Sequence, residues 1–315
     1  MSKKIALIAI GGNALLKEKE QGLQEEQLEN ARGCAEMFAN VIQAGYSLCV
    51  VHGNGPQVGN ILIQQEAGAN KIPPYTLDIA DAMTQGSMGY MIERTLINRL
   101  KYVGHATPVT TVLTEVVVDQ DDPGFENPTK PVGPFYAEHR AVELTKQKGW
   151  HMKEDAGRGW RKVVPSPKPL EIIQLEGIKT LLEAGHCVIA GGGGGIPVIR
   201  DASGLLVGVE AVIDKDRLSS LLAEQLGADT YVILTGVDKV AVDFGKPTQT
   251  WLDRMTVTEA RRHMADGQFP AGSMGPKIES AIAFIEAGGH EVLITSPEAL
   301  GREAYETVGT RIVRG

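Results

Sequence analysis

Two glycine-rich segments are the first places in this chain where residue types could hold a small anion. Gly11-Gly12-Asn13 and the segment HGNGPQVG at 52–59 each follow a short apolar run that predicts a buried strand. Glycine lets backbone N–H groups approach an anion closely. Either segment alone could be a plain turn. Because the carboxyl ends of parallel strands meet at one edge of a sheet, the two together predict a binding site there.

A third glycine segment, at 191–195, consists of five successive glycines after a predicted strand at 187–190. So many glycines cost conformational entropy on folding, and a phosphate cradle would explain that cost. A flexible loop is the alternative. His52 stands at a strand end, where a histidine is more often a hydrogen-bonded structural residue than a base, so we do not include it among the catalytic candidates.

Three lysines lie in sequence surroundings that a solvated lysine rarely has: Lys130 in NPTKP, Lys215 between two aspartates in IDKD, and Lys277 in GSMGPK. Lys277 follows a proline that suits the first position of a helix predicted at 277–287. Its charge and the helix dipole would then both face an anion. Lys215 taken alone is better explained as part of a surface salt-bridge cluster with Asp214 and Asp216.

The chain lacks several familiar nucleotide-binding and kinase signatures, namely GxxxxGK[ST], GxGxxG after a strand, HRD and DFG. Its 31 basic and 39 acidic residues give a net charge of −8, which argues against a general nucleic-acid or membrane surface. Cys34, Cys49 and Cys187 lack metal-site spacing, so we expect reduced, mostly buried thiols. The N-terminal apolar run is too short for a signal peptide, and we expect a cytoplasmic protein with no membrane segment.

The elements that must position these residues follow the alternating pattern of a parallel α/β sheet. The run at 5–10 predicts a strand, and apolar residues between 28 and 42 recur at helical spacing until Gly45, which suits a left-handed helix end. A second strand is expected at 48–51. Further helices are expected near 85–101, 172–184, 217–226 and 277–287, and further strands near 109–113, 187–190, 231–234 and 292–295.

The segment 123–169 interrupts this pattern, because it holds seven of the sixteen prolines and much charge. Proline is excluded from central strands, so this segment is not expected in the sheet. Phe125, Phe135, Trp150 and Trp160 supply apolar anchors that disordered segments usually lack. We therefore predict a small ordered insertion.

Taken in order along nearly the whole chain, eight segments resemble the carbamate kinases of the amino-acid kinase family. They are GGNA at 11–14, HGNGPQVG at 52–59, NPTKPVGPF at 127–135, EDAGRGWRKVVPSPKP at 154–169, GGGGIP at 192–197, VEAVIDKD at 209–216, LTGVD at 234–238 and GSMGPK at 272–277. The resemblance implies a three-layer αβα sandwich with a mostly parallel, eight-stranded sheet. It also implies one domain with an N-terminal acceptor and dimerisation half (about 1–115), a protruding lid subdomain (about 120–170) and a nucleotide-binding half (about 171–315).

The activity that the resemblance implies is reversible phosphoryl transfer between carbamoyl phosphate and ADP, giving ATP and carbamate. Mg²⁺ would be held mainly by the nucleotide phosphates, and the enzyme would be a homodimer. The implied catalytic residues are Lys130, Lys215, Lys277, Asp214 and Asp216, with either aspartate orienting the lysines. The carbamate end would be held by Gly11, Gly12, Asn13, Gly53, Asn54 and Gly55. The nucleotide would be held by Gly192, Gly193, Gly194, Thr235, Gly236, Val237, Asp238 and Met274.

Two alternatives remain on the sequence alone. One is another activity of the family, acetylglutamate or uridylate phosphorylation, against which the asparagine in HGNGPQVG and the NPTKP insertion argue. The other is a non-catalytic ligand-binding domain of the same fold, which would be expected to have lost a lysine or the glycine run. The sequence retains all of them.

Overall fold

The computed structural model describes residues 4–17, 20–155, 157, 159–270, 273–302, 305 and 307–315, apart from the side chain of Asn13. At its centre lies an eight-stranded sheet in the order β15-β17-β16-β12-β1-β2-β9-β3. All neighbouring pairs are parallel except β16 with β17. The strands are β1 (Ile5–Ile10), β2 (Ser47–His52), β3 (Val109–Thr111), β9 (Cys187–Ile189), β12 (Thr230–Leu234), β15 (Arg254–Thr256), β16 (Glu291–Thr295) and β17 (Thr310–Val313).

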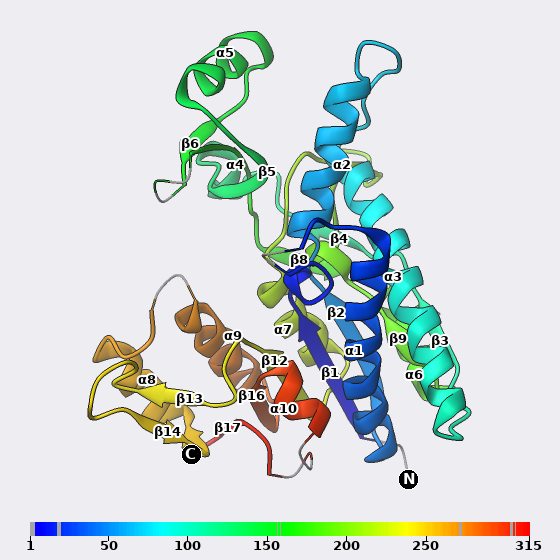
Figure 1. The fold of residues 1–315 in the computed structure, drawn as a ribbon, viewed down its shortest axis with the longest axis vertical. Helices are drawn as coiled ribbons and strands as arrows, with labels where there is room; N and C mark the ends of the chain where they lie inside the picture. The colour runs from blue at the N-terminus through cyan, green and yellow to red at the C-terminus, as the bar shows by residue number, and fades with distance from the viewer. Residues whose placement is uncertain are drawn as a thin grey trace.

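Helices cover both faces of this sheet (Figure 1). On one face lie α1 (Gln24–Gln43), α3 (Leu77–Tyr102) and α10 (Pro297–Arg302), and on the other α6 (Leu175–Glu183), α7 (Lys215–Gln225), α8 (Val257–Ala265) and α9 (Met274–Glu286). The alternation of β1 explains the two layers, since Ala6, Ile8 and Ile10 pack towards α1 and α3 while Leu7 and Ala9 pack towards α6 and α7. The predicted three-layer αβα sandwich is confirmed.

The predicted insertion forms a small sheet of its own, ordered β5-β7-β6 and antiparallel. It contains α4 (Pro123–Glu126), β5 (Lys130–Tyr136), α5 (Glu138–Lys148), β6 (Met152–Glu154) and β7 (Trp160–Val164), and it stands away from the main body (Figure 1). Its flanks join a four-stranded sheet of β11 (Leu206–Gly208), β10 (Ile196–Arg200), β4 (Glu115–Val118) and β8 (Pro169–Ile172). A hairpin of β13 (Val240–Val242) and β14 (Thr250–Leu252) completes the strands.

The aromatic anchors expected in the insertion have different roles. Phe125 packs against the central core, and Trp150 packs edge-on against Tyr136 with ring centroids 6.4 Å apart. Phe135 is 44% exposed and packs against the guanidinium of Arg161, whose Cζ lies 5.2 Å from the ring centroid. The small aliphatic residues of α5, Ala141 and Leu144, are buried in the insertion instead.

The start of two helices and the extent of one glycine-rich segment differ from the sequence pattern. The helix expected at 85–101 begins at Leu77, and the one expected at 277 begins at Met274, which puts the preceding proline at its third position rather than its first. The segment 52–59 is only partly a loop, because α2 (Gly55–Gly68) begins within it. Asparagine and proline favour the start of a helix as well as a turn, so the local sequence fits both. Among the described residues, no helix is both long and apolar enough to cross a membrane.

Candidate active site

A cavity of about 340 Å³ at the carboxyl edge of the central sheet collects most of the predicted site residues. We call it the cleft. It is lined by Gly11, Gly12, Gly53, Asn54, Gly55, Pro56, Val58, Lys130, Pro131, Val132, Gly193, Val212, Ile213, Asp214, Lys215, Asp216, Leu234 and Lys277. Lys215 is the first residue of α7, Gly55 the first of α2, and Lys277 lies in the first turn of α9. The positive ends of three helix dipoles therefore meet at a cavity that already holds three lysines.

Asp216 binds two of these lysines, one with each carboxylate oxygen. Lys215 Nζ donates to Asp216 Oδ1, and Lys277 Nζ lies 3.5 Å from Asp216 Oδ2. All three side chains are less than a fifth exposed. Burial by itself would raise the pKa of Asp216, but the two ammonium groups outweigh it and lower the pKa below its ordinary value. Asp216 therefore stays ionised and holds Lys215 and Lys277 side by side.

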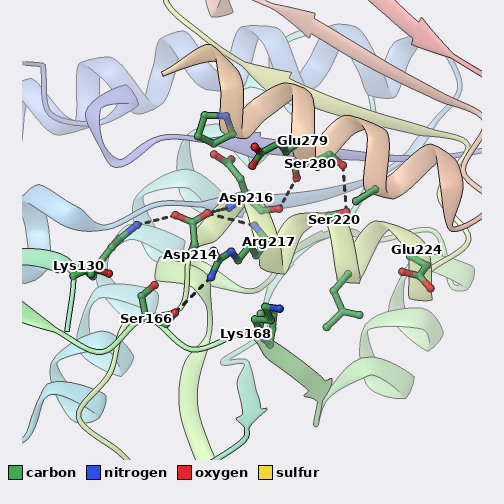
Figure 2. Close-up of a pocket in the computed structure, with 15 residues that line it drawn as sticks. Lys130, Ser166, Lys168, Asp214, Asp216, Arg217, Ser220, Glu224, Glu279 and Ser280 are labelled. Carbon is green, nitrogen blue, oxygen red and sulfur yellow. Dashed lines mark hydrogen bonds and ion pairs between the residues drawn. The ribbon is translucent and has the colours of Figure 1, made fainter. Parts of the chain in front are cut away.

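Asp214 binds the third lysine and caps α7. Its Oδ2 accepts a hydrogen bond from Lys130 Nζ at 2.8 Å, while its Oδ1 accepts from the backbone N–H groups of Asp216 and Arg217 and so caps α7. Burial opposes ionisation, yet Lys130 lowers the pKa of Asp214 to about 2. Since Lys130 begins β5, this ion pair joins the root of the insertion to α7 (Figure 2). The two aspartates thus divide the lysines between them, which the sequence left open.

The first two glycine segments meet at the floor of the cleft. A Cβ atom on Gly53 would lie 2.8 Å from the backbone nitrogen of Gly12, and one on Gly12 would lie 2.9 Å from Pro56. Real Cβ atoms do not approach so closely, so only glycine allows these two loops to pack against each other. The prediction that the strand ends bring these segments together is confirmed. The side chain of Asn13 lies outside the described residues.

The five-glycine run forms a tight, buried turn rather than a flexible loop. Cβ atoms at Gly192, Gly193 and Gly194 would lie 2.4, 2.4 and 2.1 Å from His52, Asn54 and the carbonyl oxygen of Ile213. Packing within the protein therefore explains why these positions are glycine. Gly193 lines the cleft beside Asn54, on the side expected to hold carbamate. Binding of the nucleotide by Gly192, Gly193 and Gly194 stays a prediction.

His52 lies beneath this turn and is fully buried, with its Nδ1 3.1 Å from the carbonyl oxygen of Gly53. Burial lowers the pKa of His52 to about 4, so the ring is neutral at physiological pH. This surrounding agrees with a structural histidine.

Sequence reasoning missed a polar group on α3 behind the cleft, formed by Asp81, Thr84 and Gln85. The amide of Asn54 donates to Asp81 and Thr84, and the amide of Gln85 donates to the carbonyl oxygen of Gly192 at 2.8 Å. The signal was a helical spacing of polar residues that continues the inward-facing apolar stripe from Met88 towards the N-terminus.

Apart from Gly193, the residues predicted for the nucleotide are not among those that line the cleft. Thr235, Gly236, Val237 and Asp238 follow β12, whose last residue Leu234 does line the cleft. Asp238 accepts a hydrogen bond from Ser296 Oγ, and Met274 packs partly buried against the core.

A second, larger cavity of about 640 Å³ lies between α7, α9 and the root of the insertion and shares Lys130, Asp214 and Asp216 with the cleft (Figure 2). Its remaining charged residues are mixed in sign: Lys168, Arg217, Glu224 and Glu279. The cleft, with three lysines against two aspartates, is better suited to an anion.

Comparisons with known proteins agree with this geometry. Residues 4–296 match the amino acid kinase family. A carbamate kinase of Thermococcus kodakarensis is 48% identical over 99% of both chains. A structure of the Giardia lamblia carbamate kinase bound to AMP-PNP is 41% identical, covers 99% of both chains and has a TM-score of 0.91. Another structure of that enzyme, thiocarbamoylated by disulfiram on a cysteine, is 40% identical over the full length of both chains with a TM-score of 0.91. The chain therefore belongs to the amino acid kinase family and, within it, to the carbamate kinases.

Proposed function

We propose that this protein transfers a phosphoryl group reversibly between carbamoyl phosphate and ADP, giving ATP and carbamate. The observation that carries the proposal is the cleft itself, in which Asp216 holds Lys215 and Lys277 together beside a floor of glycine backbone. Full-length similarity to carbamate kinases supports the choice of substrate.

Phosphoryl transfer requires placement of donor and acceptor in line and neutralisation of charge on the transferred group. An ammonium group has three donors, and the ion pairs with Asp214 and Asp216 occupy one donor on each lysine. The remaining donors of Lys130, Lys215 and Lys277 are available for phosphoryl oxygens. The lowered pKa values of both aspartates suit a positioning role and not proton transfer at neutral pH.

In this proposal the glycine floor and Asn54 hold the carbamoyl end, while residues 235–238 and Met274 hold the nucleotide. Mg²⁺ enters as part of the nucleotide substrate. Both carboxylates in the cleft already bind lysines, and among the described residues no group of three or more His, Cys, Asp or Glu side chains could hold a metal ion. A Mg²⁺ carried by the phosphates fits this donor set.

We infer further that the insertion is a lid whose closure brings Lys130 over the phosphate, and that the protein is a cytoplasmic homodimer. The dimer proposal rests on α3, where Ile79, Met83, Tyr90 and Ile97 expose apolar side chains at positions that share one helix face. This stripe lies in the N-terminal half, at other positions of α3 than the buried Asp81, Thr84 and Gln85.

A coupled assay that detects ATP formed from carbamoyl phosphate and ADP tests the proposed activity. In the reverse direction, acetylglutamate and UMP are offered as acceptors beside carbamate. We expect ATP from carbamoyl phosphate and no phosphorylation of the other two. Phosphorylation of acetylglutamate or UMP without turnover of carbamoyl phosphate would assign the protein to another activity of the family.

A further inference from the structure

The side chain of Asn54 does not cap the helix that follows it. Asn54 is the N-cap residue of α2, where an asparagine oxygen ordinarily accepts a hydrogen bond from the first turn of the helix, but here it makes no such bond. Its Nδ2 instead donates to Asp81 Oδ1 and to Thr84 Oγ1, each at 2.8 Å. Both partners are buried on α3. A residue that lines the cleft is therefore held from behind at the expense of a helix cap.

These contacts permit only one orientation of the Asn54 amide. Thr84 Oγ1 donates its hydrogen to the backbone carbonyl oxygen of Asp81 at 2.7 Å, so towards Asn54 it can only accept. Asp81 Oδ1 accepts from the same Nδ2. Burial raises the pKa of Asp81 to about 7, and a proton on its unpartnered Oδ2 would leave Oδ1 an acceptor. Both partners require a donor, which only Nδ2 supplies. The carbonyl oxygen Oδ1 of Asn54 is thus left over, and no described residue donates to it.

Oδ1 is an unusual group for this cleft. Besides apolar side chains, the groups that line it are lysine ammonium groups, glycine backbone and two carboxylates, and both carboxylates are paired with lysines. Gly193 closes the amide from the other side, because its Cα lies so near that an added Cβ would be 2.4 Å from Nδ2. A fixed acceptor among donors selects for a ligand that carries an N–H group as well as phosphate.

We propose that Asp81 and Thr84 are positioning residues that fix the Asn54 amide so that its Oδ1 accepts a hydrogen bond from the amino group of carbamoyl phosphate. This inference rests on the proposed function. The amino group is what distinguishes carbamoyl phosphate from acetyl phosphate, which has a methyl group in its place. Asp81 and Thr84 would therefore set substrate discrimination without touching the substrate.

The test uses the full chain with substitutions at Thr84 and Asp81. Thr84→Val removes the hydroxyl acceptor, and Thr84→Ser keeps it as the control. The double variant Asp81→Leu/Thr84→Val removes both partners of Nδ2. For each protein we would measure kcat and KM for carbamoyl phosphate with ADP. We would also measure the concentration of acetyl phosphate that halves this rate.

We expect kcat/KM for carbamoyl phosphate to fall roughly three- to tenfold in Thr84→Val and roughly ten- to hundredfold in the double variant, as loss of one oriented hydrogen bond implies. The half-inhibiting concentration of acetyl phosphate should change less than about twofold, and Thr84→Ser should resemble wild type. In an Asn54→Ala background the same substitutions should have no further effect, because the amide that they orient is gone.

Equal losses for carbamoyl phosphate and acetyl phosphate, or losses that add to those of Asn54→Ala, would show that Asp81 and Thr84 act only on the packing of α3 and would overturn the proposal. If the double variant does not fold, the comparison of Thr84→Val with Thr84→Ser decides. A wild-type protein that makes no ATP from carbamoyl phosphate would instead refute the proposed function.

Discussion

Substitution of Asp216 by asparagine separates two roles that a carboxylate in an anion site can have. The change keeps the size of the side chain and removes its charge. Three lysines against two aspartates leave the cleft with one net positive charge, and the substitution raises this to two. If charge alone mattered, an anionic substrate would bind more tightly and turnover would not suffer.

The geometry leads to the opposite expectation for turnover. Asp216 holds both Lys215 and Lys277, and without its charge these two ammonium groups repel each other in a site where each is less than a fifth exposed. At 4 Å, a pair of charges interacts by about 4 kcal/mol at the effective dielectric constant of a protein surface. That energy is sufficient to move two flexible side chains out of line with the transferred group.

We therefore expect Asp216→Asn to lower kcat by roughly 10²–10³, comparable to the loss of one oriented donor in an oxyanion site, while KM for ADP stays the same or falls. Steady-state kinetics in the direction of ATP formation would measure both constants, with a thermal melt to confirm folding. A wild-type kcat in the folded variant would refute the idea that Asp216 organises the lysines. A KM that rises in proportion to the fall in kcat would show that the carboxylate contributes to binding the nucleotide instead.

Three further predictions follow from other parts of the structure. Most turnover should be lost in Lys130→Ala and in a variant in which a Gly/Ser linker replaces residues 126–166, while both variants still bind ADP within several-fold of wild type. The deletion should also lower the free energy of unfolding by roughly 3 kcal/mol, because it removes Val132 and Val164 from a buried cluster with Val58, Leu77 and Val212. Retained kcat in either variant would exclude Lys130 from the chemistry. Asp214→Asn should lower the free energy of unfolding at pH 7 by about 1 kcal/mol, a value reduced for solvent screening because the side chain is just over a third exposed. Since the pKa of Asp214 is lowered to about 2 in the folded protein, this difference between wild type and variant should be present above pH 4 and disappear as the pH falls towards 2. Chemical denaturation of both proteins across that range would measure it, and a difference that grew in acid would contradict the prediction. Cys34, Cys49 and Cys187 are all buried, and burial raises the pKa of each thiol well above its ordinary value. A thiol reagent should therefore label none of them in the native protein and all three in guanidinium, in contrast to the relative that disulfiram modifies. Rapid labelling of one thiol in the native protein would refute this prediction.

The central sheet was predictable because its strands are buried on both faces. Such strands read as continuous apolar runs, and the run at 5–10 matches β1 residue for residue. The order of the strands was not predictable in the same way. β9 lies between β2 and β3, although more than seventy residues separate it from β3 in the sequence. Pairing of this kind depends on contacts that no local pattern encodes.

The candidate site was predictable where the sequence marks its residues by unusual neighbours, as at the glycine segments and at Lys215. It was not predictable where a residue acts through space. Asp81 and Thr84 are ordinary polar residues in the middle of a long helix, and only the fold shows that they face Asn54. The division of the lysines between Asp214 and Asp216 likewise depends on where α7 begins. Asp214 is its N-cap residue and Asp216 lies in its first turn.

The start of α7 explains how three lysines can share one cavity before any substrate arrives. Because Asp214 precedes the helix and Asp216 lies one residue inside it, their carboxylates diverge, one towards Lys130 at the root of the insertion and one towards Lys215 and Lys277. Each ammonium group is thus paired but keeps donors in reserve, so the cluster avoids the cost of unpaired buried charge. A phosphoryl group that enters would meet donors already in place, and no reorganisation of the charges would be needed in the transition state. The insertion carries one of the three lysines, and the ion pair between Lys130 and Asp214 keeps that lysine in the cleft in this structure.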